Sequence, residues 1–268
     1  MTKTNQQKVK DFLINNGVII VMFILVIYTG FTSDNFFTKN NFMNILMNMS
    51  SRLVIALGIA GCVITAGCDL SAGRMIGFGA CISGMLLQRM DYSGKFFPDM
   101  QPLNVFVVAL IAMLVCAAFG TVTGFFIAYL NVPPFIATLA MMEIVYGIGL
   151  IVTNATPLGG YVEQYTNVSN GKFLGINYLI WIAIIVAAIT WFIFNMTRHG
   201  KYMYAIGGNP QAAEVAGVPV KATLILIYMK AAAMYGLAGF MLGAKAGGAS
   251  VQTGYGYEME AIAACTIG

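Results

Sequence analysis

The chain contains apolar stretches that are too long and too free of charge for a soluble fold. Residues 12–33 hold no charged side chain, and residues 103–130 form another uncharged stretch. A helix rises about 1.5 Å per residue, so about 20 apolar residues cross a hydrocarbon core of about 30 Å. Across 268 residues the chain is 59% hydrophobic and 9% charged. A soluble fold could not bury that much apolar surface, so we predict an all-α polytopic membrane protein.

The apolar stretches predict about seven or more transmembrane helices. They are residues 12–33, 53–68, 75–88, 103–130, 135–152, 177–195 and 222–244. One helix over residues 53–88 would be about 54 Å long, too long for a single crossing, so we expect two passes or a re-entrant pair there. In residues 103–130, Gly120 and Gly124 have GxxxG spacing, which permits close helix contact or marks only a glycine-rich helix.

The polar segments between the spans predict an orientation. Residues 1–16 form a short leader in which three lysines outnumber one aspartate, as is typical of the cytoplasmic side. The first span then runs outward, into a polar, asparagine-rich segment at residues 31–51 that we expect on the external surface. Six crossings return residues 196–221 to the cytoplasmic side.

Residues 196–221 form a polar island between two apolar spans. Asn209 is typical of a helix N-cap, Pro210 of a first helical residue and Gly217 of a left-handed stop. We therefore predict a short helix over residues 210–216, roughly 10 Å long. A free helix of this length is marginal in water, so another structure must hold it, and a partner protein is one candidate.

Two glycine-interrupted stretches, near residues 67–74 and 246–260, indicate broken or re-entrant segments. In transporters such breaks mark the translocation path. Non-helical backbone at membrane depth is stable only inside protein or beside a water-filled cavity. We therefore expect the passage between the two breaks. The residues assigned to it are Asp69, Ser71, Gly73, Arg74, Glu258 and Glu260.

Asp69 also has a structural interpretation of equal weight. It could cap the half-helix that follows the break or pair with Arg74. Either role would explain the carboxylate without any contact to substrate.

Three ionisable residues lie within apolar stretches: Asp69, Glu143 and Lys230. Such groups are costly in hydrocarbon and often mark a pathway or a buried pair. Used directly, they would suit an ion-coupled secondary transporter or channel, and a membrane scaffold is a third alternative. Glu143 and Lys230 could form a pair, although the favoured interpretation is that Lys230 extends its side chain toward the headgroup region.

The sequence holds no recognisable catalytic site. It has no GxxxxGK[ST] phosphate loop, and His199 is its only histidine. The five cysteines have no metal-type spacing and suit small buried hydrophobes, so neither a metal nor a cofactor is expected. The net charge of +4 is not clustered as in a nucleic-acid-binding protein. We therefore expect no enzyme, and any ATP must be hydrolysed by a partner.

Four segments carry a resemblance to a known family. AIGGNPQAAEVAGV (residues 205–218) resembles the coupling loop of permease subunits of bacterial ABC sugar importers of the ribose, xylose and galactose type. AGCDLSAGR (66–74), AYLNVPPFIATL (128–139) and YEMEAIAAC (257–265) match the same family in the same order. The sequences DLSAGR and EMEAIAAC within these segments are most similar to the galactose/methylgalactoside branch.

The resemblance implies a single permease domain over residues 1–268 of a bacterial inner-membrane protein. Its partners would be an ABC ATPase, a periplasmic sugar-binding protein, a second permease copy and membrane lipid. The family continues into further spans where this chain stops, so C-terminal truncation is expected. The residues that would contact the ATPase are Gly207, Gly208, Asn209, Pro210, Ala213, Glu214 and Gly217.

Overall fold

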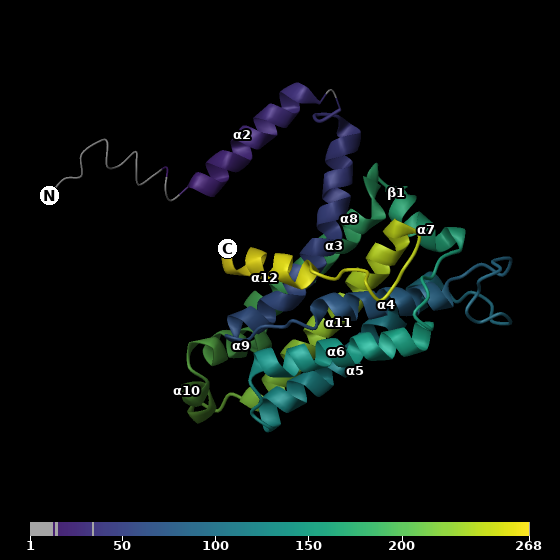
Figure 1. Ribbon diagram of the computed structural model, residues 1–268. Helices are drawn as coiled ribbons and strands as arrows, with labels where there is room; N and C mark the ends of the chain where they lie inside the picture. Colours follow the sequence, from purple (N-terminus) through teal and green to yellow (C-terminus); the bar gives the residue numbers. More distant parts are fainter. Residues whose placement is uncertain (1–12, 14–15, 34, 268) are drawn as a thin grey trace. The chain divides into compact units, whose positions relative to one another are not determined.

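A computed structural model describes residues 13, 16–33 and 35–267 (Figure 1). The helices are α2 (Gly17–Thr32), α3 (Lys39–Ile64), α4 (Ala72–Leu86), α5 (Val105–Tyr129), α6 (Pro134–Thr153), α7 (Glu163–Asn170), α8 (Tyr178–Met196), α9 (Arg198–Gly208), α10 (Pro210–Val215), α11 (Val220–Ala246) and α12 (Tyr257–Ile267). One antiparallel hairpin pairs β1 (Lys172–Phe173) with β2 (Ile176–Asn177). In this described part, α3, α5, α6, α8 and α11 are long and apolar enough to cross a membrane, while α2 and α4 are shorter apolar helices. The predicted all-α polytopic class is confirmed.

The chain divides into two compact units, residues 1–46 and 47–268. In the first unit, α2 is an apolar helix of 16 residues whose described side chains are mostly exposed, as suits a helix facing lipid. The predicted first span starts earlier, at residue 12. Residues 12, 14 and 15, with most of the predicted leader, lie outside the described residues.

Helix α11 is the centre of the second unit, with α4 and α5 packed along it. A β-carbon on Gly236 of α11 would lie 2.5 Å from the carbonyl oxygen of Ala112 on α5. One on Gly124 would lie 2.7 Å from the Cα of Ile225 on α11, and Gly120 meets Tyr228 just as closely. The GxxxG spacing on α5 therefore serves a close helix contact.

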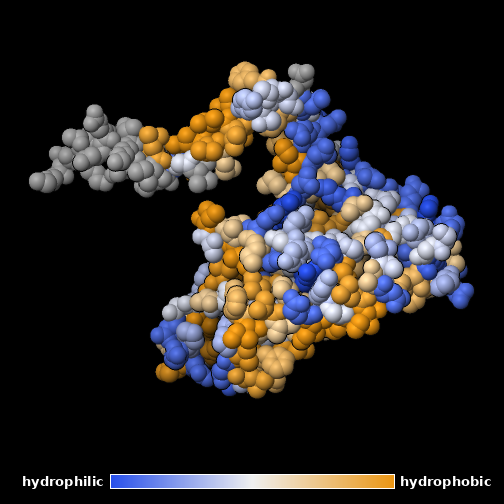
Figure 2. Space-filling model, viewed as in Figure 1, coloured by the Kyte–Doolittle hydropathy of each residue, from blue (hydrophilic) through white to orange (hydrophobic). Residues whose placement is uncertain are grey.

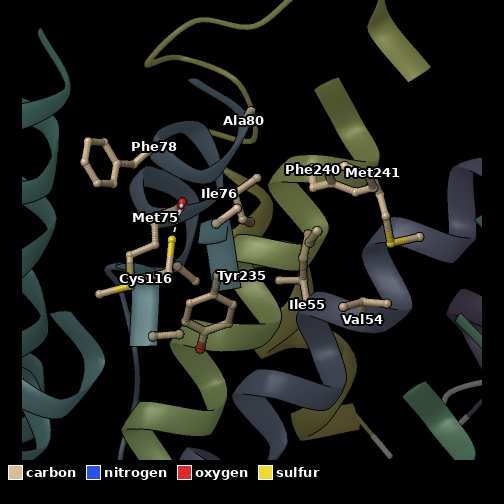
Figure 3. Close-up of a cluster of buried hydrophobic side chains, with 14 of the residues drawn as sticks. Val54, Ile55, Met75, Ile76, Phe78, Ala80, Cys116, Tyr235, Phe240 and Met241 are labelled. Carbon is tan, nitrogen blue, oxygen red and sulfur yellow. Dashed lines mark hydrogen bonds between the residues drawn. The ribbon is translucent and has the colours of Figure 1, made fainter. Parts of the chain in front are cut away.

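The interior around α11 is filled by side chains from four helices (Figure 3). The labelled residues are Val54 and Ile55 of α3, Met75, Ile76, Phe78 and Ala80 of α4, Cys116 of α5, and Tyr235, Phe240 and Met241 of α11. The Cys116 thiol donates to the carbonyl oxygen of Met75 at 3.6 Å. These contacts hold the start of α4 against the middle of α11.

The loops of the second unit gather at two ends. At one end, Gly207 of α9 lies against Ile64 at the end of α3, and Lys221 lies 5.2 Å from the ring centre of Tyr129. At the other end, Leu158 pairs with Ala249 in a β-bridge, as Gln88 does with Tyr161. Figure 2 shows polar surface at the α10 corner and over the loops at the right, with apolar surface between. Helices α5 and α11 therefore connect the two polar ends, whereas α4 starts against the middle of α11.

One sequence prediction about the elements was wrong. Residues 39–51 were expected in a polar surface segment, but α3 begins at Lys39 and continues through them to Ile64. No glycine or proline lies between Lys39 and Leu57, so nothing in this polar stretch stops a helix. The prediction that residues 53–88 cannot be one helix is confirmed, because the chain leaves α3 after Ile64 and starts α4 at Ala72.

Candidate functional site

The first break, between α3 and α4, is organised by Asp69. Its side chain is 1% exposed. One carboxylate oxygen accepts from the Ser71 backbone N–H at 3.0 Å and from the Ser71 hydroxyl at 2.5 Å. The other accepts from the Tyr235 hydroxyl at 3.1 Å. Ser71 immediately precedes α4, so Asp69 fixes the start of this half-helix to the middle of α11.

The structural interpretation of Asp69 is matched only in part, because the N-cap of α4 is Ser71, which has no side-chain cap bond, and Asp69 bonds to Ser71 instead. Asp69 fixes the start of α4 through Ser71, but within the described residues it forms no ion pair with Arg74. Arg74 instead donates from Nη1 to the carbonyl oxygen of Val251 at 3.3 Å and to Oε1 of Gln252 at 2.7 Å.

The second break, between α11 and α12, lies directly against the first. Glu258 is 4% exposed, and its Oε2 accepts from the Gly256 N–H at 3.0 Å. A β-carbon on Gly73 would overlap the same carboxylate oxygen and would lie 3.1 Å from the Gly254 carbonyl oxygen. Any side chain at position 73 would therefore displace the Glu258 carboxylate. The structure therefore brings Asp69, Ser71, Gly73, Arg74 and Glu258 together around the meeting point of the two breaks.

Glu260 lies apart from this group. Its Oε2 accepts from Nε of Arg52 on α3 at 2.7 Å, and about half of its side chain is exposed. Glu260 is one of the residues assigned from sequence to the passage, but its contact in the structure is this surface ion pair with α3.

The other two intramembrane charges do not meet. Glu143 is exposed on α6, and the described residues show no ion pair between it and Lys230. The Nζ of Lys230 is buried, lies 5.4 Å from the ring centre of Phe194 and has no hydrogen-bond partner among the described residues. That Lys230 extends its side chain toward the headgroup region stays a prediction, but its ammonium group is enclosed by protein. Phe194 closes over the ammonium group near the end of α8.

The polar segment after α8 folds as two short helices. Thr197 caps α9, and the side chain of Asn209 accepts from the Ala212 N–H at 2.9 Å to cap α10. Gly217 has a φ of +82° and ends the segment in the left-handed conformation. Helix α10 runs over Pro210–Val215 with Ala216 as its C-cap, so the predicted helix and its stops are confirmed to within one residue.

The predicted coupling residues have distinct positions in this segment. Ala213 is buried, whereas Gly208, Asn209, Pro210, Glu214 and Gly217 are exposed. Gly207 is held against the carbonyl oxygen of Ile64, the last residue of α3. The segment is therefore joined by direct backbone contact to the start of the first break, while its tip is open.

Sequence reasoning missed four polar residues around the breaks: Tyr146, Tyr235, Gln252 and Tyr255. The tyrosines look like ordinary span or loop aromatics in a chain with 13 of them. Their roles depend on contacts between residues more than 100 positions apart, such as Tyr235 with Asp69. Among the described residues, no three His, Cys, Asp or Glu side chains converge as metal ligands.

Comparison with known proteins agrees with this architecture. Residues 41–268 match the family described as "Branched-chain amino acid transport system / permease component". The chain is 38% identical, over its whole length and 82% of the relative, to the galactose/methyl galactoside import permease protein MglC of Escherichia coli K12. The protein of that name from Haemophilus influenzae is 40% identical over the same shares. The ribose import permease protein RbsC of Escherichia coli K12 is 32% identical, over 97% of this chain and 78% of the relative.

No solved structure matches the chain. The family match nevertheless covers most of its length, and the apolar helices of the described part are those of a multi-pass inner-membrane protein. The chain therefore belongs to the family of branched-chain amino acid transport system permease components.

Proposed function

We propose that this permease forms the passage for a monosaccharide, of the galactose or methyl galactoside kind, in an ATP-driven importer. The observation that carries the proposal is the identity of 38–40% with galactose/methyl galactoside import permeases over the whole chain. The geometry supports it, because the two broken segments meet at Gly73 and Glu258. Broken backbone at membrane depth is the arrangement that transporters place around their passage.

The energy would come from an ABC ATPase that binds the α9–α10 segment. This chain has no phosphate-binding loop of its own. Helix α10 offers a compact, exposed surface that includes Val215 at 91% exposure and that a partner protein would cover. Movement of the ATPase would then reach the first break through Gly207 and Ile64. We place this end and the N-terminus in the cytoplasm.

The remaining partners are proposed on the same basis. A secreted sugar-binding protein would deliver substrate at the opposite end, where residues 87–104, 154–177 and 247–250 gather. Two copies of the permease would enclose one passage within the lipid bilayer. No covalent chemistry is required of this chain, because alternating exposure of the passage suffices for transport.

The proposal is tested by reconstituting the chain with its ATPase and binding protein in vesicles. Galactose uptake should require ATP on the side of the vesicle membrane where the ATPase lies. Simultaneous replacement of Asn209, Pro210 and Glu214 should cause the ATPase to be lost when the permease is purified. Uptake driven by an ion gradient without ATP would contradict the proposal and favour the ion-coupled alternative. Accessibility of a cysteine placed at Glu214 to an impermeant reagent on intact cells would contradict the orientation.

A further inference from the structure

Arg74, in the first turn of α4, is stacked between two tyrosines. Its guanidinium carbon lies 3.9 Å from the ring centre of Tyr146 on α6 and 4.2 Å from that of Tyr255 in the second break. Arginine stacks well on aromatic rings because its guanidinium is planar and weakly hydrated. The two rings hold this cation at the meeting point of α4, α6 and the second break.

The hydrogen bonds in the guanidinium plane are incomplete. Nη1 is bonded to Val251 and Gln252, and the side-chain amide of Gln252 in turn donates to the Tyr146 hydroxyl at 3.2 Å. Nε of Arg74 is buried and has no hydrogen-bond partner among the described residues. A buried donor without an acceptor costs about 1–3 kcal/mol, and more when it is charged. The site is therefore one acceptor short along its Nε edge.

Polar groups are exposed beside this cluster, among apolar side chains such as Leu139 and Ile144, although it lies along a membrane-spanning helix. Glu143 is exposed on α6 one turn before Tyr146, and a β-carbon on Gly147 would meet nothing within 4 Å. The ring of Tyr255 is 57% exposed and Gln252 is exposed. Exposed charged and amide groups at this depth are stable beside water and costly beside lipid tails. This face of α6 and the second break thus suits a water-filled passage.

We propose that the guanidinium of Arg74, together with Gln252 and the exposed ring of Tyr255, is a contact site for the hydroxyl groups of the sugar in transit, and that its Nε edge, buried in this conformation, meets the sugar when the two breaks move apart during transport. This inference rests on the proposed function and names the residues that would touch the substrate. A monosaccharide presents hydroxyl oxygens that accept from Arg74 and an apolar C–H face that stacks on an aromatic ring. Asp69 and Glu258, whose carboxylates are occupied by protein donors, hold the two breaks in place behind the site.

The test uses the chain reconstituted with its ATPase and binding protein. Uptake of galactose is compared with uptake of its four monodeoxy analogues by the wild-type protein and by Arg74→Lys and Tyr255→Ala. Arg52→Lys is the matched control, because Arg52 also stacks on a tyrosine, Tyr257 at 4.6 Å, but lies on α3 beside Glu260. The same binding protein serves every variant, so its own preferences cancel in the ratio between variants.

We expect one deoxy analogue to enter at least about tenfold more slowly than galactose in the wild type, the effect of one lost charge-assisted hydrogen bond. That difference should disappear in Arg74→Lys and persist in Arg52→Lys. Tyr255→Ala should slow all five sugars. A uniform loss in Arg74→Lys with the wild-type ratios preserved would mean that Arg74 only braces the breaks, and would overturn the inference. If the wild-type protein shows no ATP-dependent uptake of galactose, the proposed function itself is rejected instead.

Discussion

Gly207 of α9 lies so close to the carbonyl oxygen of Ile64 that no β-carbon fits between them. Ile64 is the last residue of α3, and the first break follows it directly. The contact is between two backbones, so it has no side-chain freedom to absorb a displacement. A force on α9 and α10 would therefore act at once on the backbone that leads to Asp69.

Gly207→Ala should weaken this junction. The added methyl group overlaps a carbonyl oxygen that cannot rotate away, so the helices must separate, at a cost of about 1–3 kcal/mol. We expect a lower thermal unfolding temperature in detergent and reduced uptake per ATP hydrolysed. Gly208→Ala is the matched control, because a β-carbon there meets nothing within 4 Å. If Gly207→Ala and Gly208→Ala have the same unfolding temperature and the same uptake per ATP hydrolysed, the close contact between Gly207 and Ile64 does not couple ATP hydrolysis to transport.

Asn209→Ala should loosen α10 without disturbing the transmembrane helices. The Asn209 side chain satisfies the Ala212 N–H, and loss of such a cap typically costs about 1 kcal/mol. Amide exchange at residues 211–216 should become faster, while exchange in α11 stays unchanged. Gln211→Ala, an exposed change on the same helix, should leave the exchange rates as they are. Unaltered exchange in Asn209→Ala would mean that packing on α9, not the cap, holds the helix.

Asp69→Ala and Glu260→Ala should differ sharply in stability. Removing the Asp69 carboxylate leaves the Ser71 and Tyr235 hydroxyls without their acceptor in a buried site, at a cost of about 1–3 kcal/mol. Glu260 loses only an exposed ion pair with Arg52, worth less than about 1 kcal/mol. Thermal unfolding of both purified variants measures the difference. A small effect at Asp69 would remove its role in holding the first break.

Local signals account for what the sequence predicted well. Asn209 and Pro210 are local signals for the start of α10, and Gly217 is a local signal for its end. The structure has the helix between them. The interruption between α3 and α4 followed from length alone, because one helix over both would exceed the bilayer. The start of α3 was not predicted, because the polar residues 39–51 were assigned to a surface segment. Polar residues by themselves do not end a helix, and α3 begins at Lys39.

The partners within the site could not be read in the same way. Asp69 and Arg74 are close in sequence and opposite in charge, which suggested a pair, yet each bonds to a distant segment instead. These contacts depend on how α4 packs against α6, α11 and the second break. A single sequence shows the residue types but not this packing, and therefore left Tyr146, Gln252 and Tyr255 unassigned.

His199, in α9, predicts how stability should change with pH. The pKa of the imidazole is lowered from 6.5 to about 4. The larger cause is its partial burial, and the smaller is the nearby positive charge of Lys230 on α11. The unfolded chain therefore takes up a proton below pH 6.5 that the folded chain does not take up until about pH 4. Stability should fall as the pH drops through this window and should not depend on His199 above it.

Thermal unfolding between pH 7 and pH 5 tests this. His199 is the only histidine, and ordinary carboxylates titrate below this range, so the difference between the wild type and His199→Gln isolates the contribution of this group. His199→Gln should flatten the dependence, because glutamine does not titrate. Lys230→Met removes a positive charge that lowers the pKa of His199, so the folded-state pKa should rise and the pH window of falling stability should become narrower. An unchanged window would show that the ammonium group does not act on the imidazole. A wild-type protein equally stable at pH 7 and pH 5 would show that the imidazole is not held neutral.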